Sequence, residues 1–153
     1  MLAGVLLAAG IGSRFEGGNK LLTSKEDEPI VVKAARPLVR STNCTVAILG
    51  YESERIRATL AEQNFPIFFK KNLDYRSGQG SSVKAGTRWA RELDANGAIY
   101  ALGDMPYVSQ STYDELKEAF YRREANIVYP TYEGQRGNPV IFGQEHFEEL
   151  CSL

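Results

Sequence analysis

The sequence predicts an α/β fold, in which a mostly parallel sheet is covered by helices on both faces as a three-layer sandwich. Short continuous apolar runs, such as "VLLAA" at 5–9, are typical of strands that are buried on both faces. These runs alternate along the chain with segments whose apolar residues have helical spacing. Such alternation is typical of parallel strands that are joined by helices.

The first half of the chain contains three expected strands and two expected helices. Pro37 lies inside the first helical segment, and we expect it to kink or end that helix. The second helical segment has acidic residues in its first turn, where they suit the helix dipole. In order, the expected elements are a strand at 5–9, a helix at 29–41, a strand at 45–51, a helix at 52–64 and a strand at 66–71.

The second half continues the alternation after a polar, glycine-bearing loop at 72–82. A helix follows in which Val83, Gly86, Ala90 and Leu93 share one face. Ser109 or Ser111 is positioned to cap the next helix. The expected elements are a strand at 97–106 that ends at Gly-Asp-Met-Pro, a helix at 111–124, strands at 125–133 and 139–143, and a short helix near the end.

Composition limits the possible partners. The chain has 153 residues, of which 43% are hydrophobic, which suits one domain with its own core. Its formal net charge is -1, from 18 basic and 19 acidic residues. This balance gives no broad electrostatic surface for nucleic acid or an anionic membrane, so an anionic ligand must be held locally.

Cysteine usage and hydropathy indicate a cytoplasmic protein. Cys44 and Cys151 lie far apart, without a C-x-x-C pair or clustered histidines, so we expect reduced thiols and no zinc site. No apolar run is long enough to span a bilayer. We therefore expect no membrane partner.

Three chemically unusual segments follow expected strands, and ligands of such sheets bind beyond the carboxyl ends of the strands. They are the glycine loop after residue 9, the "SGQGSS" segment at 77–82, and the acid Asp104 after "YALG". The first loop fits neither the dinucleotide fingerprint nor the P-loop pattern. Another residue type stands where the fingerprint has its third glycine, and another stands where the P-loop has its lysine. A glycine-rich backbone with Arg14 and Lys20 nevertheless suits a triphosphate. The alternative is an ordinary surface loop with two solvated cations.

The pattern L-A-A-G-x-G-x-R-F-x-x-G-x-K-L-L at 7–22 closely resembles the nucleotide-binding signature of the MobA-like NTP transferase family, and within it the molybdenum cofactor cytidylyltransferases. Three later segments resemble further family motifs in the same order. They are "NLDYRSGQGSSVKAG", "ALGDMP" and "YEGQRGNPVIF". The resemblance covers nearly the whole chain and implies a Rossmann-like nucleotidyltransferase fold.

This resemblance implies roles for individual residues. The backbone from Leu7 to Gly10 reads the base, Arg14 and Lys20 hold the phosphates, and Asp104 binds Mg²⁺. Arg136, Gly137 and Asn138 lie near the acceptor or the phosphates. The implied catalytic residues are Arg14, Lys20 and Asp104, and the implied nucleotide-binding residues are Leu7, Ala8, Ala9, Gly10, Gly12, Arg14, Lys20, Gly80, Ser81 and Ser82.

Several of these residues also have a purely structural interpretation. Asp104 can instead form an Asx turn before Pro106. The segment Gly80 to Ser82 either caps a helix or contacts base and ribose, and the segment 136–138 is otherwise a turn. We expect His146 to be a surface residue without a functional partner.

The resemblance implies a Mg²⁺-dependent nucleotidyltransferase of cytidylyl or guanylyl type. CTP is the favoured substrate and a molybdopterin-type phosphate the favoured acceptor. Family chains continue past the point that corresponds to Leu153, into a Gly-Asp segment that completes the metal site, so we expect the C-terminal part of the family pattern to be missing from this single domain at 1–153. The alternatives are a nucleotide-binding module without turnover and a sugar- or polyol-phosphate nucleotidyltransferase.

Overall fold

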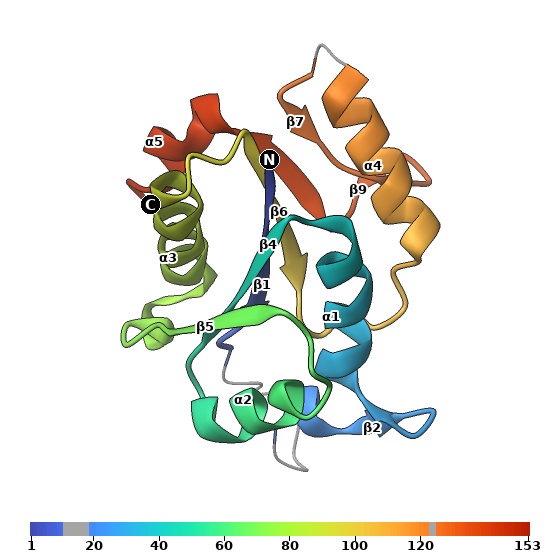
Figure 1. The fold of residues 1–153 in the computed structure, drawn as a ribbon, viewed down its shortest axis with the longest axis vertical. Coiled ribbons are helices and arrows are strands. Elements are labelled where there is room, and N and C mark those ends of the chain that lie inside the picture. The colour runs from blue at the N-terminus through green and yellow to red at the C-terminus, as the bar shows by residue number, and fades with distance from the viewer. Residues whose placement is uncertain (11–18, 123–124) are drawn as a thin grey trace.

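A six-stranded sheet in the order β5-β4-β1-β6-β10-β7 organises the fold (Figure 1). The computed structural model describes residues 1–10, 19–122 and 125–153. The four strands β5, β4, β1 and β6 are mutually parallel, whereas β10 runs antiparallel to both β6 and β7. The strands are β1 (Leu2–Ala8), β4 (Cys44–Leu49), β5 (Ile67–Lys71), β6 (Gly97–Leu102), β7 (Ile127–Val128) and β10 (Val140–Gly143).

Helices cover both faces of this sheet, which confirms the predicted α/β fold with three layers. One face carries α1 (Ile30–Ser41), α2 (Ser53–Ala61) and α4 (Gln110–Arg122). The other face carries α3 (Gln79–Glu92) and the short α5 (Phe147–Leu150), on the left in Figure 1. Two small hairpins lie outside the sheet, β2 (Ser24–Lys25) with β3 (Glu28–Pro29) and β8 (Thr131–Tyr132) with β9 (Gln135–Arg136).

The strand β1 shows why the apolar runs are continuous. Successive side chains of a strand point to opposite faces, so Leu6 and Ala8 pack against the α1 side while Val5 and Leu7 pack against the α3 side. Every residue of β1 is buried. A strand with two buried faces has no polar face, so its sequence does not alternate between apolar and polar residues.

The chain changes direction at β1. From β1 it runs outward through β4 to β5, and α3 then returns it across the sheet to β6 on the other side of β1. The carboxyl ends of β1 and β6 therefore lie side by side where the connections diverge. In open α/β sheets, ligands bind in the crevice at such a point.

The start of α3 corrects one prediction. Residues 72–82 are not all loop, because α3 begins at Gln79 after Gly78, whose φ of 117° few side chains tolerate. Gly80, Ser81 and Ser82 thus belong to the first turn of the helix and do not precede it. Neither serine is the N-cap residue, which is Gly78.

Asn72 fixes this helix start to the end of β5. It is buried, and its Nδ2 donates to Ser81 Oγ at 2.8 Å and to Ser82 Oγ at 3.0 Å. Its Oδ1 accepts the backbone N–H of Asp74 at 3.0 Å. Ser81 Oγ in turn donates toward the carbonyls of Asp74 and Gly78. The side chain of Asn72 therefore connects strand, loop and helix.

The extent of α1 agrees with the helix expected at 29–41, and Pro37 does not end it, because its apolar face is buried in the core and packing outweighs the lost backbone hydrogen bond. Two other expectations about local structure are wrong. Residues 125–133 form two short strands, β7 and β8, and not one, since Pro130 between them has no N–H for a ladder. His146 is half-buried, with its ring edge-on to Phe142 at a centroid distance of 5.9 Å, because the short C-terminal helices pack it onto the sheet.

The other helix boundaries agree with the sequence to within a few residues. Ser109 is the residue that caps α4, since its Oγ accepts the N–H of Thr112 at 3.2 Å. Cys44 and Cys151 are free and half-buried. In the described part of the chain, no helix combines the length and apolar character needed to cross a membrane.

Gly86 allows α3 to approach β1 closely, which gives the first prediction. A Cβ at Gly86 lies 2.4 Å from Val5 Cγ1, whereas a Cβ at Gly80 in the same helix meets nothing nearer than 3.9 Å. Gly86→Ala should lower the free energy of unfolding by about 1–3 kcal/mol, because the clash exceeds the gain in helix propensity. Gly80→Ala is the matched control and should be neutral or stabilising in denaturant titrations. Equal effects of the two changes would show that close packing at Gly86 is unimportant.

A second prediction concerns Asn72. Asn72→Ala leaves two serine hydroxyls and one backbone N–H without their partner, and should cost about 1–3 kcal/mol of unfolding free energy. Amide hydrogen exchange should accelerate most in residues 74–83. The exposed Asn126 offers a control, and Asn126→Ala should leave these amides unchanged. Unaltered exchange at 74–83 in Asn72→Ala would contradict the role assigned to Asn72.

Candidate nucleotide site

A small cavity lies at the carboxyl ends of β1 and β6. Its volume is about 120 Å³. Among the described residues, three leucines supply its apolar wall, namely Leu7, Leu21 and Leu102. The remaining lining residues are Gly10, Asn19, Lys20, Gln79 and Asp104.

The ladder between β1 and β6 brings the two halves of this cavity together. Leu7 pairs with Leu102 in register, and the backbone N–H of Gly103 donates to Leu7 O at 3.0 Å. A Cβ at Gly103 lies 3.1 Å from the same carbonyl, so the strands are in close contact up to this point. Asp104 is the next residue and is therefore held directly beyond the end of β1.

The turn that contains Asp104 is closed by backbone atoms. The N–H of Met105 donates to Leu102 O at 3.2 Å. An Asx turn at Asp104 requires an N–H two residues later, and Pro106 has none. Asp104 is exposed, and its carboxylate makes no hydrogen bond or ion pair with the described residues. The carboxylate is thus available to a ligand or cation.

Lys20 enters the cavity from the other side. It begins a short 3-10 helix, Lys20–Leu22, for which the preceding Asn19 is the cap. The side chain of Lys20 is exposed and forms no ion pair with the described residues. Gly12 and Arg14, which the sequence assigns to the same phosphates, lie outside the described residues.

The predicted base-reading segment 7–10 has two kinds of residue. Leu7 and Gly10 line the cavity, and a Cβ at Gly10 meets nothing within 4 Å. Ala8 and Ala9 are buried, and the carbonyl of Ala9 accepts the N–H of Tyr51 at 3.3 Å. That hydrogen bond fixes the segment to the residues that follow β4.

Gly80, Ser81 and Ser82 do not line this cavity, although Gln79 at the start of the same helix does. Both serine hydroxyls accept hydrogen bonds from Asn72. The three residues therefore follow Gln79 in the first turn of α3 and lie outside the cavity wall. A helix start of this kind presents unsatisfied backbone N–H groups and the positive end of the helix dipole.

Arg136, Gly137 and Asn138 lie at the same edge of the sheet but in a separate place. Since β10 runs antiparallel and its Val140 pairs with Tyr100, the residues before β10 lie beyond the carboxyl end of β6. The Arg136 guanidinium lies over the ring of Tyr129, 5.3 Å from its centroid. Arg136 and Gly137 line a second cavity of about 400 Å³, which does not include Lys20 or Asp104.

Asn19 and Gln79 line the cavity but were not identified from the sequence. Their positions carry a weak signal, since Asn19 precedes Lys20 and Gln79 follows the glycine at a helix start. Among the described residues, no three or more His, Cys, Asp or Glu side chains gather in one place where they could hold a metal ion together. Asp104 is the one carboxylate among the described residues that line the cavity.

Known proteins share this architecture. Nicotine blue oxidoreductase of Paenarthrobacter nicotinovorans is 34% identical over 146 residues, which are 92% of this chain and 70% of that protein. A nucleotidyl transferase from Methanothermobacter has 18% identity and a TM-score of 0.84 over 100% of this chain and 76% of its own. Rv0371c from Mycobacterium tuberculosis has 24% identity and a TM-score of 0.81 over 99% of this chain and 76% of its own. A structure of Rv0371c in complex with manganese has 22% identity and a TM-score of 0.74, with the same coverage.

The three structural likenesses, all at 24% identity or below, concern the fold alone and confirm the predicted Rossmann-like fold. The family itself follows from the sequence. Residues 4–153 match the MobA-like NTP transferase domain, so the motif resemblance is confirmed over nearly the whole chain. The chain belongs to the MobA-like NTP transferase family.

Proposed function

We propose that this protein transfers a nucleoside monophosphate from an NTP to a phosphate-bearing acceptor and releases pyrophosphate. The observation that carries the proposal is the composition of one cavity. A lysine cation, the start of α3 and a carboxylate without a partner among the described residues meet where β1 and β6 end. Cationic groups suit the phosphates, and the carboxylate suits a cation that accompanies them.

The reaction requires an acceptor phosphate oxygen to attack the α-phosphorus of the NTP. The new P–O bond forms as the bond to the departing pyrophosphate breaks. Such a reaction depends mainly on positioning and on neutralising negative charge, with no covalent step on the protein. In this proposal Lys20 contacts the phosphate oxygens, and the apolar wall formed by Leu7 and Leu102 shields one side of the bound nucleotide.

A divalent cation, which we propose to be Mg²⁺, fits the carboxylate of Asp104 in the cavity wall. Mg²⁺ usually takes one or two protein carboxylates, and phosphates and water complete its coordination. Asp104 meets this need because it is exposed and has no competing partner among the described residues. When bound, the cation neutralises charge on the phosphates. Manganese in the complex of Rv0371c supports a divalent metal in this family.

The nucleotide and acceptor that we propose are CTP and a molybdopterin-type phosphate, and we propose that the protein acts in the cytoplasm. The choice of CTP rests on Ala9, which stands where family members that use GTP tend to have glycine. Arg136, Gly137 and Asn138 lie at the same edge of the sheet, so we assign them to the acceptor. The free thiols suit a reducing compartment. A sugar or polyol phosphate is the alternative acceptor.

A second candidate function comes from the relative named nicotine blue oxidoreductase, which is 34% identical over most of this chain. A redox role requires the same cavity to hold a nucleotide that donates or accepts electrons. A nucleotide-binding module without turnover is the third candidate. Turnover assays separate all three.

The third prediction tests the roles of Lys20 and Asp104 with paired variants. Lys20→Ala should weaken CTP binding by about 1–3 kcal/mol with and without Mg²⁺, because it removes a charge-assisted contact. Asp104→Asn should leave binding without Mg²⁺ intact and abolish the strengthening that Mg²⁺ provides. Calorimetric titrations measure both effects, and thermal unfolding without ligand should hardly change. A full Mg²⁺ effect in Asp104→Asn would remove Asp104 from the site.

The fourth prediction tests the reaction and the base. With Mg²⁺ and candidate acceptors, pyrophosphate release should be faster with CTP than with GTP. A clear preference for GTP would overturn the cytidylyl assignment. Oxidation of NADH or NADPH by an added electron acceptor, with no pyrophosphate release from any nucleotide and acceptor, would favour the redox candidate. Tight NTP binding without either activity would favour the binding module.

A further inference from the structure

Among the described residues that line the cavity, Asn19 is the most deeply buried polar one, and one end of its carboxamide has no partner there. Only 5% of the residue is exposed, and it lines the cavity together with Lys20 and Asp104. Its Nδ2 is buried and has no hydrogen-bond partner among the described residues. A buried donor without an acceptor costs about 1–3 kcal/mol, so native structures seldom keep one without a reason.

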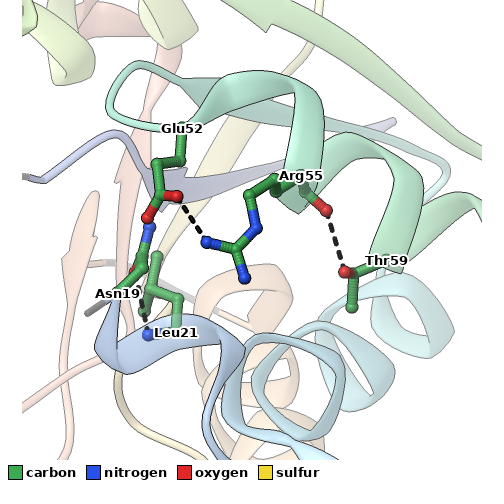
Figure 2. Close-up of polar contacts among 5 residues, drawn as sticks. All are labelled: Asn19, Leu21, Glu52, Arg55 and Thr59. Atoms are coloured by element: carbon green, nitrogen blue, oxygen red, sulfur yellow. Dashed lines mark hydrogen bonds and ion pairs between the residues drawn. The ribbon is translucent and has the colours of Figure 1, made fainter. Parts of the chain in front are cut away.

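The orientation of this carboxamide is fixed by its other end. Oδ1 of Asn19 accepts the backbone N–H of Leu21 at 3.0 Å and so caps the short helix that carries Lys20 (Figure 2). If the carboxamide were flipped, its Nδ2 would face the N–H of Leu21, and two donors would meet. Nδ2 is therefore the end that is left to bind another group, and as a donor it can bind only a hydrogen-bond acceptor.

The nearby Glu52 carboxylate (Figure 2) is a protein group of which one oxygen is engaged. Figure 2 shows the Glu52 carboxylate and the Asn19 carboxamide pointing toward one another from neighbouring segments. Glu52 Oε2 accepts from Arg55 Nη1 at 2.5 Å, and Arg55 O accepts from Thr59 Oγ1 at 2.8 Å. No hydrogen bond joins Glu52 to Asn19. Glu52 is nevertheless the structural rival that a test must separate from a ligand.

We propose that Asn19 is a substrate-binding residue whose Nδ2 donates to an acceptor oxygen of the bound nucleotide. This inference rests on the proposed function and adds a neutral donor to the Lys20 cation beside it. The acceptor is either a phosphoryl oxygen or a carbonyl oxygen of the base, since both accept without donating. Because Oδ1 holds the helix start that positions Lys20, one side chain binds the ligand and orders its neighbour.

The decisive variant is Asn19→Ser. Serine is also a good cap, so it can retain the hydrogen bond to Leu21 N–H while losing the Nδ2 donor. It also avoids a second carboxylate facing Glu52, which Asn19→Asp would introduce. CTP binding with Mg²⁺ should weaken about tenfold or more, as loss of a hydrogen bond to a charged or buried acceptor does. The unfolding temperature without ligand should change little.

Two control variants separate a ligand contact from a structural one. Glu52→Ala removes the rival acceptor and should leave CTP affinity unchanged. Asn43 resembles Asn19, since its Oδ1 accepts the N–H of Leu2 at 2.7 Å, but it lies at the opposite edge of the sheet. Asn43→Ser should therefore also leave CTP affinity unchanged. Inorganic tripolyphosphate identifies the acceptor: equal weakening of CTP and tripolyphosphate in Asn19→Ser assigns a phosphoryl oxygen, and weakening of CTP alone assigns the base.

A measurement on the unmodified chain guards against a variant that fails to fold. The side-chain amide signals of Asn19 should shift in NMR spectra on addition of CTP with Mg²⁺, whereas those of Asn43 should not. If CTP binds and neither the Asn19 signals nor the affinity of Asn19→Ser changes, the inference is wrong while the proposed function stands. Equal loss of unfolding temperature in Asn19→Ser and Glu52→Ala, with unchanged affinity, makes Asn19 structural. No NTP binding by the unmodified chain overturns the inference and the proposed function together.

Discussion

The parallel ladder between β1 and β6 is the constraint on which the rest of the structure depends. It places Leu7 opposite Leu102, so that the segment after β1 and the acid after β6 emerge at one point. The chain can form this pair only by running out to β5 and returning through α3. The long return also brings the start of α3 to the same edge, with Gln79 in the cavity wall. The cavity is thus a consequence of strand order and not of any single loop.

Close backbone contact makes this arrangement rigid. Gly86 lets α3 lie directly on Val5, and Gly103 lets the end of β6 lie against the carbonyl of Leu7. Asn72 ties the first turn of α3 to the end of β5 through both serine hydroxyls. Such contacts fix the charged groups of a site before a ligand arrives, which lowers the cost of positioning it. Asp104 and the Nδ2 end of Asn19, which have no partner among the described residues, both lie in the wall of the cavity.

Much of the fold could be predicted from the sequence, because strands buried on two faces and amphipathic helices have distinct patterns. The start of α3 could not, since glycines and serines favour loops unless a buried partner such as Asn72 holds them in a helix. The extent of α1 could be predicted to within one residue, and burial of its apolar face explains why Pro37 does not end it. Among the residues that line the cavity, the motifs include Lys20 and Asp104 but not Asn19. The role that we propose for Asn19 depends on its burial and on an Nδ2 without a partner among the described residues, which no sequence pattern records.

The central claim is that an NTP binds at the carboxyl ends of β1 and β6. Hydrogen–deuterium exchange with and without CTP and Mg²⁺ tests it most directly, because it reads all segments at once. The account predicts protection at residues 7–10, 19–22, 79–82 and 102–105. It predicts no protection around the cavity at the opposite edge, which is lined by Arg91, Asp94, Ala95, Gln144, Phe147 and Glu148. Protection at that opposite cavity, with none at 19–22 and 102–105, would contradict the account.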